Sequence, residues 1–482
     1  MSAPFLWILL PGITASIMLL FNRSERGVRI AGMVVTMWLA WAAWILPVGE
    51  ALALGPVSIK VSESLNLLGR EFILADGDRG LVAVLYLLTF CWLAGAAVAK
   101  PGRLFAPLAL MLVALLTAAV AVEPFLFAAL ILEVAVLIVI PLLSPPDQKP
   151  GRGVFRFLTF QTLGMPFILF TGWMLEGVEA SPSNLDLVVN AGVLLGIGFA
   201  FLLAVFPFHS WIPMLLEESH PYVSSFIFFM LPAMVSVFAL GFFDRYVWLR
   251  ESPPVQSALL GLGAMMALAG GIWTAVEKHL GRIFGYLVVS EIGLILLSVG
   301  LINEVGTLLF FWLFLTRALG YLIWGVTLSQ VKQRSRGSLR VQALRGLGAK
   351  RPLLAIGIFA AHFSLAGLPL LAGFPVRMRL LDELAGRSAA AAALVLLGNV
   401  GLLLGGLNLF SYLFIYSSPE KMAVTAGRKL GEGLDPAEKQ KQLMKIAMFS
   451  AVMLVLLVVG IAPQSLLPIL LRMGKMFVQI GG

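Results

Sequence analysis

Long apolar runs constrain this chain more than any other feature of its sequence. Runs of about 20 residues, the length of helix that crosses about 30 Å of bilayer hydrocarbon, recur from Phe5 to Leu471. They lack the strict alternation of apolar and polar residues that marks a membrane β-barrel. The chain is also 60% hydrophobic and 12% charged, whereas soluble domains are roughly 45–50% apolar and about 25% charged. We therefore predict an all-α membrane protein.

The apolar runs accommodate about fourteen transmembrane helices, at roughly 20 residues for each helix. The first run, at residues 1–21, lacks the basic start and the small-residue cleavage pattern of a signal peptide, so we interpret it as the first span. The predicted spans are centred near residues 12, 37, 88, 112, 133, 165, 196, 232, 265, 291, 317, 365, 402 and 457.

Basic residues are concentrated in alternate connections between the predicted spans. The connection between the eleventh and twelfth spans contains no acidic residue, and its basic residues are Lys332, Arg334, Arg336, Arg340, Arg345, Lys350 and Arg351. The positive-inside rule places such connections in the cytoplasm and both termini outside, which fits the inner membrane of a prokaryote. The short link with Glu217 and Glu218 departs from this pattern. We interpret the basic loops as orientation signals, with docking of a cytoplasmic partner as the alternative.

The rest of the composition gives no support to a soluble enzyme. Cys91 is the only cysteine and lies in an apolar run, so neither a disulfide framework nor a metal site is predicted. No glycine-rich phosphate loop or nucleophile constellation occurs in the sequence. The net charge of +9 belongs to the connections between spans, which argues against nucleic acid as a partner. We expect a chain that lies in the lipid bilayer and holds no cofactor of its own.

A single carboxylate lies inside the fifth apolar run. Glu133 occupies the segment FLFAALILEVAVLIVIPLL, where an acidic side chain at the centre of a membrane helix costs roughly 2.5 to 3.5 kcal/mol on insertion scales. Ionisable residues at such positions usually mark ion or proton paths. We predict that Glu133 is buried and paired with a basic side chain, and we expect this partner to be Arg156, one helix away.

Glycine and proline interrupt two of the apolar runs. The segment FSLAGLPLLAGFPVR, residues 363–377, contains Gly367, Pro369, Gly373 and Pro375. Proline removes a backbone donor and clashes with the preceding helical turn, and unwound helix at membrane depth is tolerated chiefly where it is buried in protein or lines a cavity. The segment therefore indicates an ion path. Pro232 is a second candidate break, in the eighth span, although a lone proline more often marks only a packing kink.

Three segments together resemble a known family. FPFHSWIP (206–213), GRIFGYLVVSEIG (281–293) and FSLAGLPLLAGFPVR (363–377) look like signature stretches of the antiporter-like membrane subunits of respiratory complex I, the NADH-quinone oxidoreductase. That family also includes subunits of multisubunit cation/proton antiporters and membrane-bound hydrogenases. The resemblance covers nearly the whole chain, and it implies two inverted five-helix repeats, each with a broken helix, and a chain of buried charges across the membrane centre.

The resemblance also implies a division of the chain into four stretches of one polytopic membrane domain. The stretches are the N-terminal helices at 1–122, a first repeat at 123–243, a second repeat at 254–416, and a cytoplasmic connection with a C-terminal helix at 417–482. The residues that match the charged positions of the family are Glu133 in the fifth helix, Arg156 in the sixth, Glu291 in the tenth, Arg317 in the eleventh and Arg377 in the twelfth.

Two central lysines of the family are absent from this chain. The seventh-helix position, five residues before the proline of the PFH motif, is Leu202. The eighth-helix position falls on Pro232 or Ala233. The signatures of the fold therefore persist while the titrating centre has changed.

The arginines at the family's lysine positions differ from lysine in their chemistry. A desolvated lysine can lose its proton, whereas arginine stays protonated at any accessible pH. We therefore interpret Arg156, Arg317 and Arg377 as fixed countercharges, because a buried ion is tolerable mainly when it is paired. The carboxylates Glu133 and Glu291 can still titrate.

His362, near the predicted break, is a further titratable candidate, although a lone histidine on an apolar helix is more often structural. We predict a dry gap near Leu202 that divides the polar axis into two clusters. One cluster contains Glu133 and Arg156, and the other contains Glu291, Arg317, His362 and Arg377.

The leading functional prediction is an antiporter-like membrane subunit of a complex-I-related oxidoreductase or hydrogenase. Such a non-catalytic subunit couples electron transfer elsewhere in the complex to movement of protons or sodium ions. The first alternative is a subunit of a cation/proton antiporter or of an inorganic-carbon uptake system. The second is a structural relative that no longer pumps, which the replacement of the central lysines favours and the retained Glu133 and Glu291 oppose.

Overall fold

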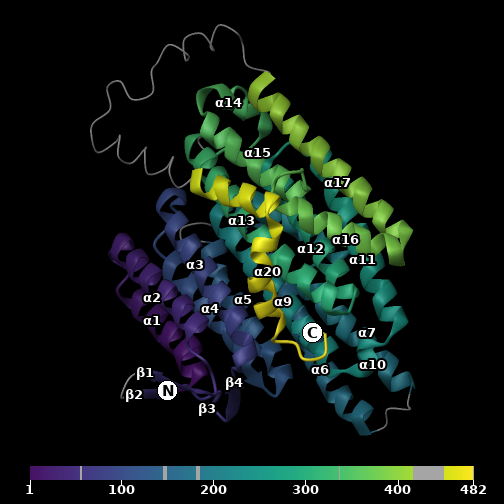
Figure 1. Cartoon of the computed structure of the whole chain (residues 1–482). Coiled ribbons are helices and arrows are strands. Elements are labelled where there is room, and N and C mark those ends of the chain that lie inside the picture. Colours follow the sequence, from purple (N-terminus) through teal and green to yellow (C-terminus); the bar gives the residue numbers. More distant parts are fainter. Residues whose placement is uncertain (55–56, 145–148, 181–184, 336, 416–449, 481–482) are drawn as a thin grey trace.

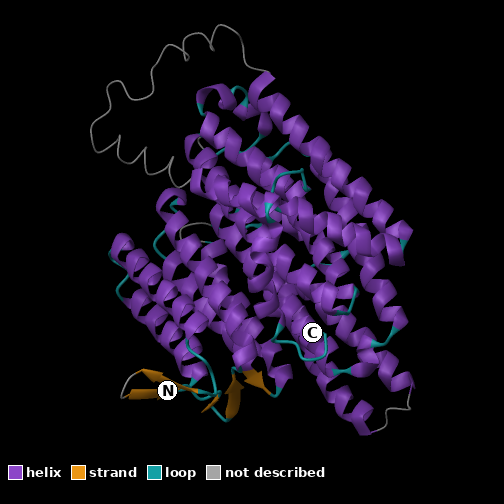
Figure 2. Cartoon of the chain, viewed as in Figure 1, coloured by secondary structure: helices purple, strands orange, loops and turns teal. Residues whose placement is uncertain are grey.

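A computed structural model describes residues 1–54, 57–144, 149–180, 185–335, 337–415 and 450–480. Helices form nearly all of the described chain and run side by side, and a few short strands lie at the end of the bundle where the N-terminus sits (Figure 1 and Figure 2). The predicted class, an all-α membrane protein, is confirmed.

The N-terminal part consists of six helical elements, which are η1 (Phe5–Leu9), α1 (Leu10–Leu20), α2 (Glu25–Ile45), η2 (Asp76–Asp78), α3 (Arg79–Ala99) and α4 (Phe105–Ala121). Five strands were not predicted, and they are β1 (Ala51–Leu54), β2 (Val57–Lys60), β3 (Ser64–Leu67), β4 (Arg70–Ile73) and β5 (Val122–Glu123). β1 pairs antiparallel with β2, and β4 lies between β3 and β5. The Ser62 amide donates to the Met1 carbonyl at 3.0 Å, which places the N-terminus at the strand end of the bundle.

The central part of the chain follows β5 with η3 (Phe125–Phe127), α5 (Ala128–Leu143), α6 (Arg152–Ala180), α7 (Leu185–Leu202), η4 (Phe208–Ser210), α8 (Trp211–Glu218), α9 (Pro221–Arg245) and α10 (Val247–Arg250). The next part consists of α11 (Pro253–Val276), α12 (Leu280–Gly300), α13 (Glu304–Arg334), η5 (Val341–Leu344), α14 (Leu347–Lys350), α15 (Pro352–Ala366), α16 (Gly373–Arg387), α17 (Ala389–Phe410) and η6 (Ser411–Ile415). The C-terminal part contains the helix Ser450–Ile461, η7 (Pro463–Leu466) and α20 (Leu467–Gly474).

The number of membrane crossings can be compared with the fourteen predicted centres. Nine helices in the described ranges are long and apolar enough to cross a membrane, or ten if one bent pair is counted. Four shorter apolar helices, Phe5–Leu20, Phe105–Ala121, Asp186–Leu202 and Pro352–Ala366, contain the centres predicted at 12, 112, 196 and 365. Every predicted centre thus lies in a helix, while the count of fourteen spans stays a prediction.

The interior of the bundle is formed by α9, α12 and α13. In their most apolar windows 100%, 94% and 83% of the residues are buried, against 39% for α2 and α11. The charged side chains in the middle of α12 and α13, Glu291 and Arg317, therefore lie inside the protein and away from lipid.

Glycines allow α11 to pack closely against both α12 and α17. A Cβ added at Gly271 would lie 2.0 Å from the carbonyl oxygen of Gly398, and one at Gly270 would lie 2.6 Å from the backbone nitrogen of Ser290. Small residues permit such close approach of membrane helices. The contact at Ser290 holds α12 in place next to Glu291, the following residue of the same helix.

Two spans are broken. α15 ends at Ala366 and α16 begins at Gly373, and the connecting backbone is left-handed at Gly367, with φ of +77°, and at Leu370, with φ of +73°. The second break separates α7, which ends at Leu202, from α8, and η4 lies within it.

The candidate break at Pro232 is wrong, because α9 continues through this residue. Proline lacks the N–H that would bond to the carbonyl four residues earlier, and in this helix that carbonyl belongs to Phe228. The carbonyl of Phe228 instead accepts a long hydrogen bond from Arg317 Nη2 at 3.5 Å. The missing donor is thus compensated from α13, and the helix does not need to unwind.

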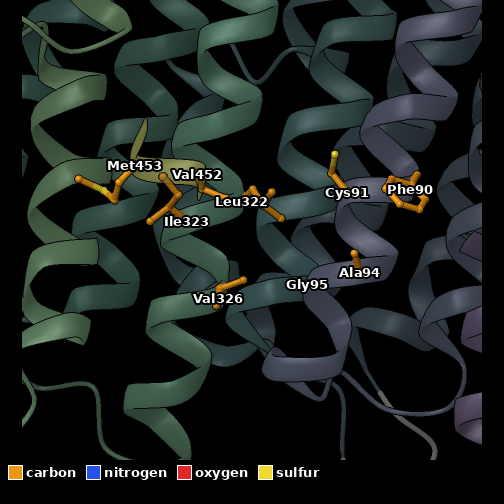
Figure 3. A pocket seen from close by; sticks show the side chains of 9 residues that line it. All are labelled: Phe90, Cys91, Ala94, Gly95, Leu322, Ile323, Val326, Val452 and Met453. Carbon is orange, nitrogen blue, oxygen red and sulfur yellow. The ribbon is translucent and has the colours of Figure 1, made fainter. Parts of the chain in front are cut away.

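The predicted single C-terminal helix is also incorrect. The helices Ser450–Ile461 and Pro463–Gly474 form a pair bent by 103°, and the bend coincides with Pro463, which cannot donate a backbone hydrogen bond. Gly460 packs against the α15–α16 break, since a Cβ there would lie 2.2 Å from the Leu370 carbonyl oxygen. On the same helix, Val452 and Met453 contribute to a groove beside α3 and α13 (Figure 3).

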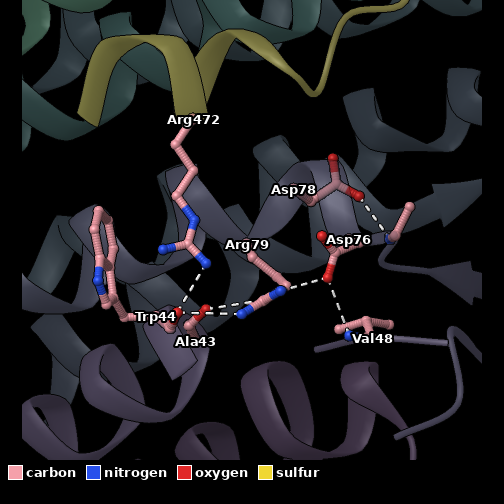
Figure 4. A network of polar contacts seen from close by, with 8 residues as sticks. Ala43, Trp44, Val48, Asp76, Asp78, Arg79 and Arg472 are labelled. Atoms are coloured by element: carbon pink, nitrogen blue, oxygen red, sulfur yellow. Dashed lines mark hydrogen bonds and ion pairs between the residues drawn. The ribbon is translucent and has the colours of Figure 1, made fainter. Parts of the chain in front are cut away.

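A polar network ties α20 to the ends of α2 and α3 (Figure 4). Arg472 Nη2 donates to the Trp44 carbonyl at 2.8 Å, and Arg79 Nη2 donates to the same carbonyl at 3.1 Å. Arg79 also pairs with Asp76, whose Oδ1 accepts from the Val48 amide at 3.1 Å. The C-terminal helix is therefore fastened to the N-terminal helices at the strand end of the bundle.

Candidate functional site

Three charged side chains meet in the interior of the bundle, beside the α15–α16 break. Glu291 on α12, Arg317 on α13 and Arg377 on α16 are only 1%, 1% and 3% exposed. Arg377 Nη2 donates to Glu291 Oε1, and Arg317 Nε lies 3.7 Å from Glu291 Oε2. Arg377 Nη1 also donates to Asn399 Oδ1 on α17. The structure thus brings together three of the six residues predicted for the charge axis.

The break in the span positions Arg377. This arginine lies in the second turn of α16, and its side chain runs back across Gly367, where an added Cβ would lie 2.5 Å from Arg377 Cδ. Gly367 also has a positive φ, a conformation that costs other residues roughly 1–2 kcal/mol. Glycine at this position therefore permits both the chain reversal and the approach of the guanidinium to Glu291.

The charges of this cluster do not balance. Arginine remains protonated at any accessible pH, so two guanidinium groups surround one carboxylate. Arg317 Nε and Nη1 make no hydrogen bond in the described part of the protein, and neither do the neighbouring hydroxyl of Tyr321 and Oγ of Ser364. Arg377 is the well-bonded partner of Glu291, and Arg317 is the loosely held one.

His362, on α15, was predicted to belong to this cluster, but none of its hydrogen bonds goes to the three charged residues. Its ring is fully buried, and Nε2 lies 2.8 Å from the carbonyl oxygen of Leu402. A carbonyl only accepts, so Nε2 carries the hydrogen. Nδ1 is then an acceptor that has no hydrogen-bond partner among the described residues.

Glu133 and Arg156 do not form the predicted pair. Glu133 is half-buried and accepts a hydrogen bond from Thr162 Oγ1 at 2.7 Å, and it takes part in no ion pair among the residues that the structure describes. Arg156 is exposed, and its Nη1 lies 3.4 Å from Met214 Sδ. Thr162 follows Arg156 by six residues, which is about 9 Å along a helix at 1.5 Å per residue. The arginine therefore lies too near the start of α6 to reach the carboxylate.

The altered relay positions lie in apolar surroundings. Leu202 is 6% exposed and Ala233 is fully buried. A small cavity at this point contacts Leu202 and Pro232. Among the described residues that line it, Gln161 and Trp211 have polar side-chain atoms. Gln161 Nε2 donates to the Leu202 carbonyl at 2.9 Å, whereas Gln161 Oε1 and the indole N–H of Trp211 have no hydrogen-bond partner there.

Sequence reasoning missed Asn399 and Gln161. Each is a polar side chain within an apolar run, and this signal is available from the sequence. It does not say which neighbouring helix the side chain faces. Asn399 accepts a second hydrogen bond from Arg377. Gln161 donates to the carbonyl of Leu202, which is left without a helical partner at the end of α7.

The fold and the site together define a polytopic helical membrane protein with a buried charge cluster beside a broken helix. The chain belongs to the NADH:quinone oxidoreductase/Mrp antiporter transmembrane family, whose family model matches residues 158–405. The resemblance stated from the sequence segments is therefore confirmed.

Individual relatives are similar over different lengths. Subunit 14 of the NADH-quinone oxidoreductase of Thermus thermophilus is 27% identical over 386 residues, which cover 78% of this chain and 81% of the relative. Subunit N of Cytophaga hutchinsonii is 28% identical over 263 residues, or 53% of this chain and 55% of the relative. The chain spans about half the length of several of the curated relatives it matches, as with 42% for subunit N of a Wolbachia species.

Solved structures share the fold of the whole chain. A chain of the Mrp complex from Dietzia sp. DQ12-45-1b superposes with a TM-score of 0.79 at 19% identity, covering 100% of this chain and 97% of the other. A chain of respiratory complex I from Thermus thermophilus superposes with a TM-score of 0.73 at 22% identity, covering 99% and 100%. A chain of the archaeal membrane-bound sulfane sulfur reductase gives 0.79 at 15% identity, covering 100% and 98%.

Proposed function

We propose that this chain is an antiporter-like membrane subunit of a multisubunit complex related to respiratory complex I. In this role it moves protons or sodium ions while other subunits transfer electrons, and it holds no cofactor itself. The observation that carries the proposal is the buried Glu291 cluster at the α15–α16 break. A titratable carboxylate beside an interrupted helix is a feature of ion paths, because interrupted helix is tolerated at membrane depth chiefly where it is enclosed by protein or lines a cavity.

The ion path is confined to the half of the subunit around Glu291 and Arg377. Between this cluster and Glu133 lie the apolar side chains at Leu202 and Pro232. Among the described residues that line the local cavity, only Gln161 and the indole N–H of Trp211 are polar. A proton needs water or polar groups to cross such a region. The apolar side chains at this point support a division of the predicted axis into two halves.

A neighbouring membrane subunit covers the face that carries Glu133. The carboxylate is half-buried, and the apolar side chains beside it are open to the outside of the bundle, with Val134 46% exposed and Leu137 50% exposed. A carboxylate at membrane depth with only Thr162 as partner is costly against lipid. A basic or hydrogen-bonding side chain from an adjacent subunit removes that cost.

Both termini lie outside the cytoplasm. They occupy the same end of the bundle. Met1 bonds to Ser62, beside the strands. The amides of Val478, Gln479 and Ile480 donate to the Asp244 carboxylate, and the next residue, Arg245, pairs with Glu123 of β5. The basic segment from Lys332 lies at the opposite end, with α8 and the link between α11 and α12. The positive charge of this segment supports a position on the cytoplasmic side of the membrane, by the positive-inside rule.

The second candidate is a structural subunit that does not translocate ions. Two arginines that cannot lose their protons surround Glu291, and protonation of Glu291 would leave both guanidinium groups buried without a counterion. Two other assemblies could contain the same chain as a membrane subunit, a cation/proton antiporter and an inorganic-carbon uptake system. They differ from the proposed complex in the partner subunits.

Purification of the intact complex from membranes, with identification of its subunits, tests the proposal. We expect electron-transfer subunits and further membrane subunits to co-purify with the chain, and we expect electron transfer to drive proton or sodium movement in proteoliposomes. Partners without any redox subunit would overturn the proposal in favour of an antiporter or carbon-uptake role. Electron transfer that depends on this chain for assembly, but moves no ion through it, would favour the structural role.

A further inference from the structure

An apolar groove lies between α3 and α13, and it is lined by other residues than those of the Glu291 cluster (Figure 3). The lining residues are Phe90, Cys91, Ala94, Gly95, Leu322, Ile323, Val326, Val452 and Met453. The groove has a volume of about 200 Å³, and Phe90, Cys91 and Ala94 on its α3 wall are partly exposed. It is therefore an open hollow in the outer surface of the helical bundle.

The groove and the stretch of α3 that follows it together have the length of one membrane leaflet. Phe90 precedes Lys100, the residue that ends α3, by ten residues, which is about 15 Å of helix at 1.5 Å per residue. Half of the roughly 30 Å hydrocarbon layer is the same length. A hydrocarbon chain that starts at the level of Lys100 would therefore end near Phe90, at the middle of the bilayer.

Basic side chains lie at the ends of α3 and α13, beyond Gly95 and Val326, the last groove residues on these two helices. Gln330 and Gln333 on α13 donate to the carbonyls of Val98 and Ala99 at 2.8 and 2.7 Å, which holds the ends of α3 and α13 together. Lys100 and Arg334 are the exposed neighbours of these contacts. Neither forms an ion pair within the described part of the chain.

We propose that this groove binds one acyl chain of an anionic phospholipid, whose phosphate group contacts Lys100 and Arg334. The apolar walls accept the hydrocarbon, and the two free cations at one end select a negative headgroup. Basic pockets between membrane helices recognise anionic lipids in this way, at about fivefold in affinity for each Lys or Arg near the surface. A helix from a partner fits poorly, because Val452 and Met453 close one side of a hollow that a helix of about 10–12 Å diameter would have to enter.

The chain contains its own reporter for this site, because Cys91 is the only cysteine and it lines the groove. The full chain is reconstituted in nanodiscs of phosphatidylcholine, either alone or with phosphatidylglycerol, and the rate of Cys91 alkylation by a lipophilic maleimide is measured. We expect phosphatidylglycerol to slow the reaction at least fivefold. The variant Lys100→Gln, Arg334→Gln should lose this protection.

Occupancy is measured separately, by native mass spectrometry of phosphatidylglycerol retained on the protein. Ala94→Phe fills the groove and should abolish retention, whereas Ala97→Phe is a matched control on the exposed side of the same helix and should retain the lipid. Equal alkylation in the two lipid mixtures would overturn the proposal. Protection in both mixtures would overturn it as well, since a protein segment would then occupy the groove, and so would equal retention in the two alanine variants.

Discussion

The two arginines of the Glu291 cluster should contribute unequally to stability. Arg377 bonds to both Glu291 and Asn399, so Arg377→Met leaves a buried carboxylate without its main partner, at about 3–5 kcal/mol. Arg317 reaches Glu291 only at 3.7 Å and leaves Nε and Nη1 without hydrogen bonds. Arg317→Met removes the excess positive charge and keeps the better pair, and of the hydrogen bonds described it gives up only the long one to the Phe228 carbonyl. We therefore expect a change of about 1 kcal/mol or less, since apolar replacement of buried charge is often neutral.

The free energy of unfolding of both variants can be measured by steric trapping in bicelles. Arg377→Met should be less stable than Arg317→Met by at least about 2 kcal/mol, roughly a thirtyfold difference in the unfolding equilibrium. Arg379→Met is a control on the same helix, because Arg379 is 51% exposed and pairs with the exposed Asp382, and such surface pairs contribute about 0–1 kcal/mol. If Arg317→Met destabilised the protein as much as Arg377→Met, the assignment of roles within the cluster would be refuted.

Three further predictions concern other parts of the chain. Ser338→Cys, in a chain without its native cysteine, should react with an impermeant thiol reagent only from the cytoplasmic side, and labelling from outside would reverse the proposed topology. Burial and then the charge of Lys332 lower the pKa of His220 to about 4. The folded protein therefore binds this proton more weakly than the unfolded chain does, whose histidine pKa is about 6.5. Stability should fall as the pH drops from about 6.5 to 4, and a denaturation series in which His220→Gln shows the same fall would disprove the role of this side chain. Gly367→Ala, at a positive φ and against Arg377, should lower the unfolding free energy by at least about 1–2 kcal/mol, and unchanged unfolding would mean that the break accommodates a side chain.

The fold class followed from the sequence because each apolar run is long enough to form a membrane helix. The α15–α16 break was visible because glycine and proline cluster at residues 363–377. The break between α7 and α8 was not placed, because attention to proline alone pointed to Pro232, whose lost hydrogen bond is compensated by Arg317 from another helix. A proline in the sequence shows which backbone N–H is missing, but it does not show which side chain from another helix replaces that donor.

The Glu291 cluster and the Glu133 pair show where sequence reasoning about the site ends. Buried charges must find partners, and this argument led to Glu291, Arg317 and Arg377 together. The same argument failed for Glu133 and Arg156, since it ignored how far apart two residues lie along their helices. A partner that belonged to another subunit would leave no trace in this chain beyond a half-buried carboxylate such as Glu133.

The central claim is that ion movement through this subunit depends on the half around Glu291 and not on a relay through Leu202. The direct test is the ratio of protons or sodium ions moved to electrons transferred by the reconstituted complex, with Glu291→Gln and Glu133→Gln compared at equal assembly and equal electron transfer. The account predicts a lower ratio for Glu291→Gln and an unchanged ratio for Glu133→Gln. A lower ratio for Glu133→Gln, or an unchanged ratio for Glu291→Gln, would contradict it.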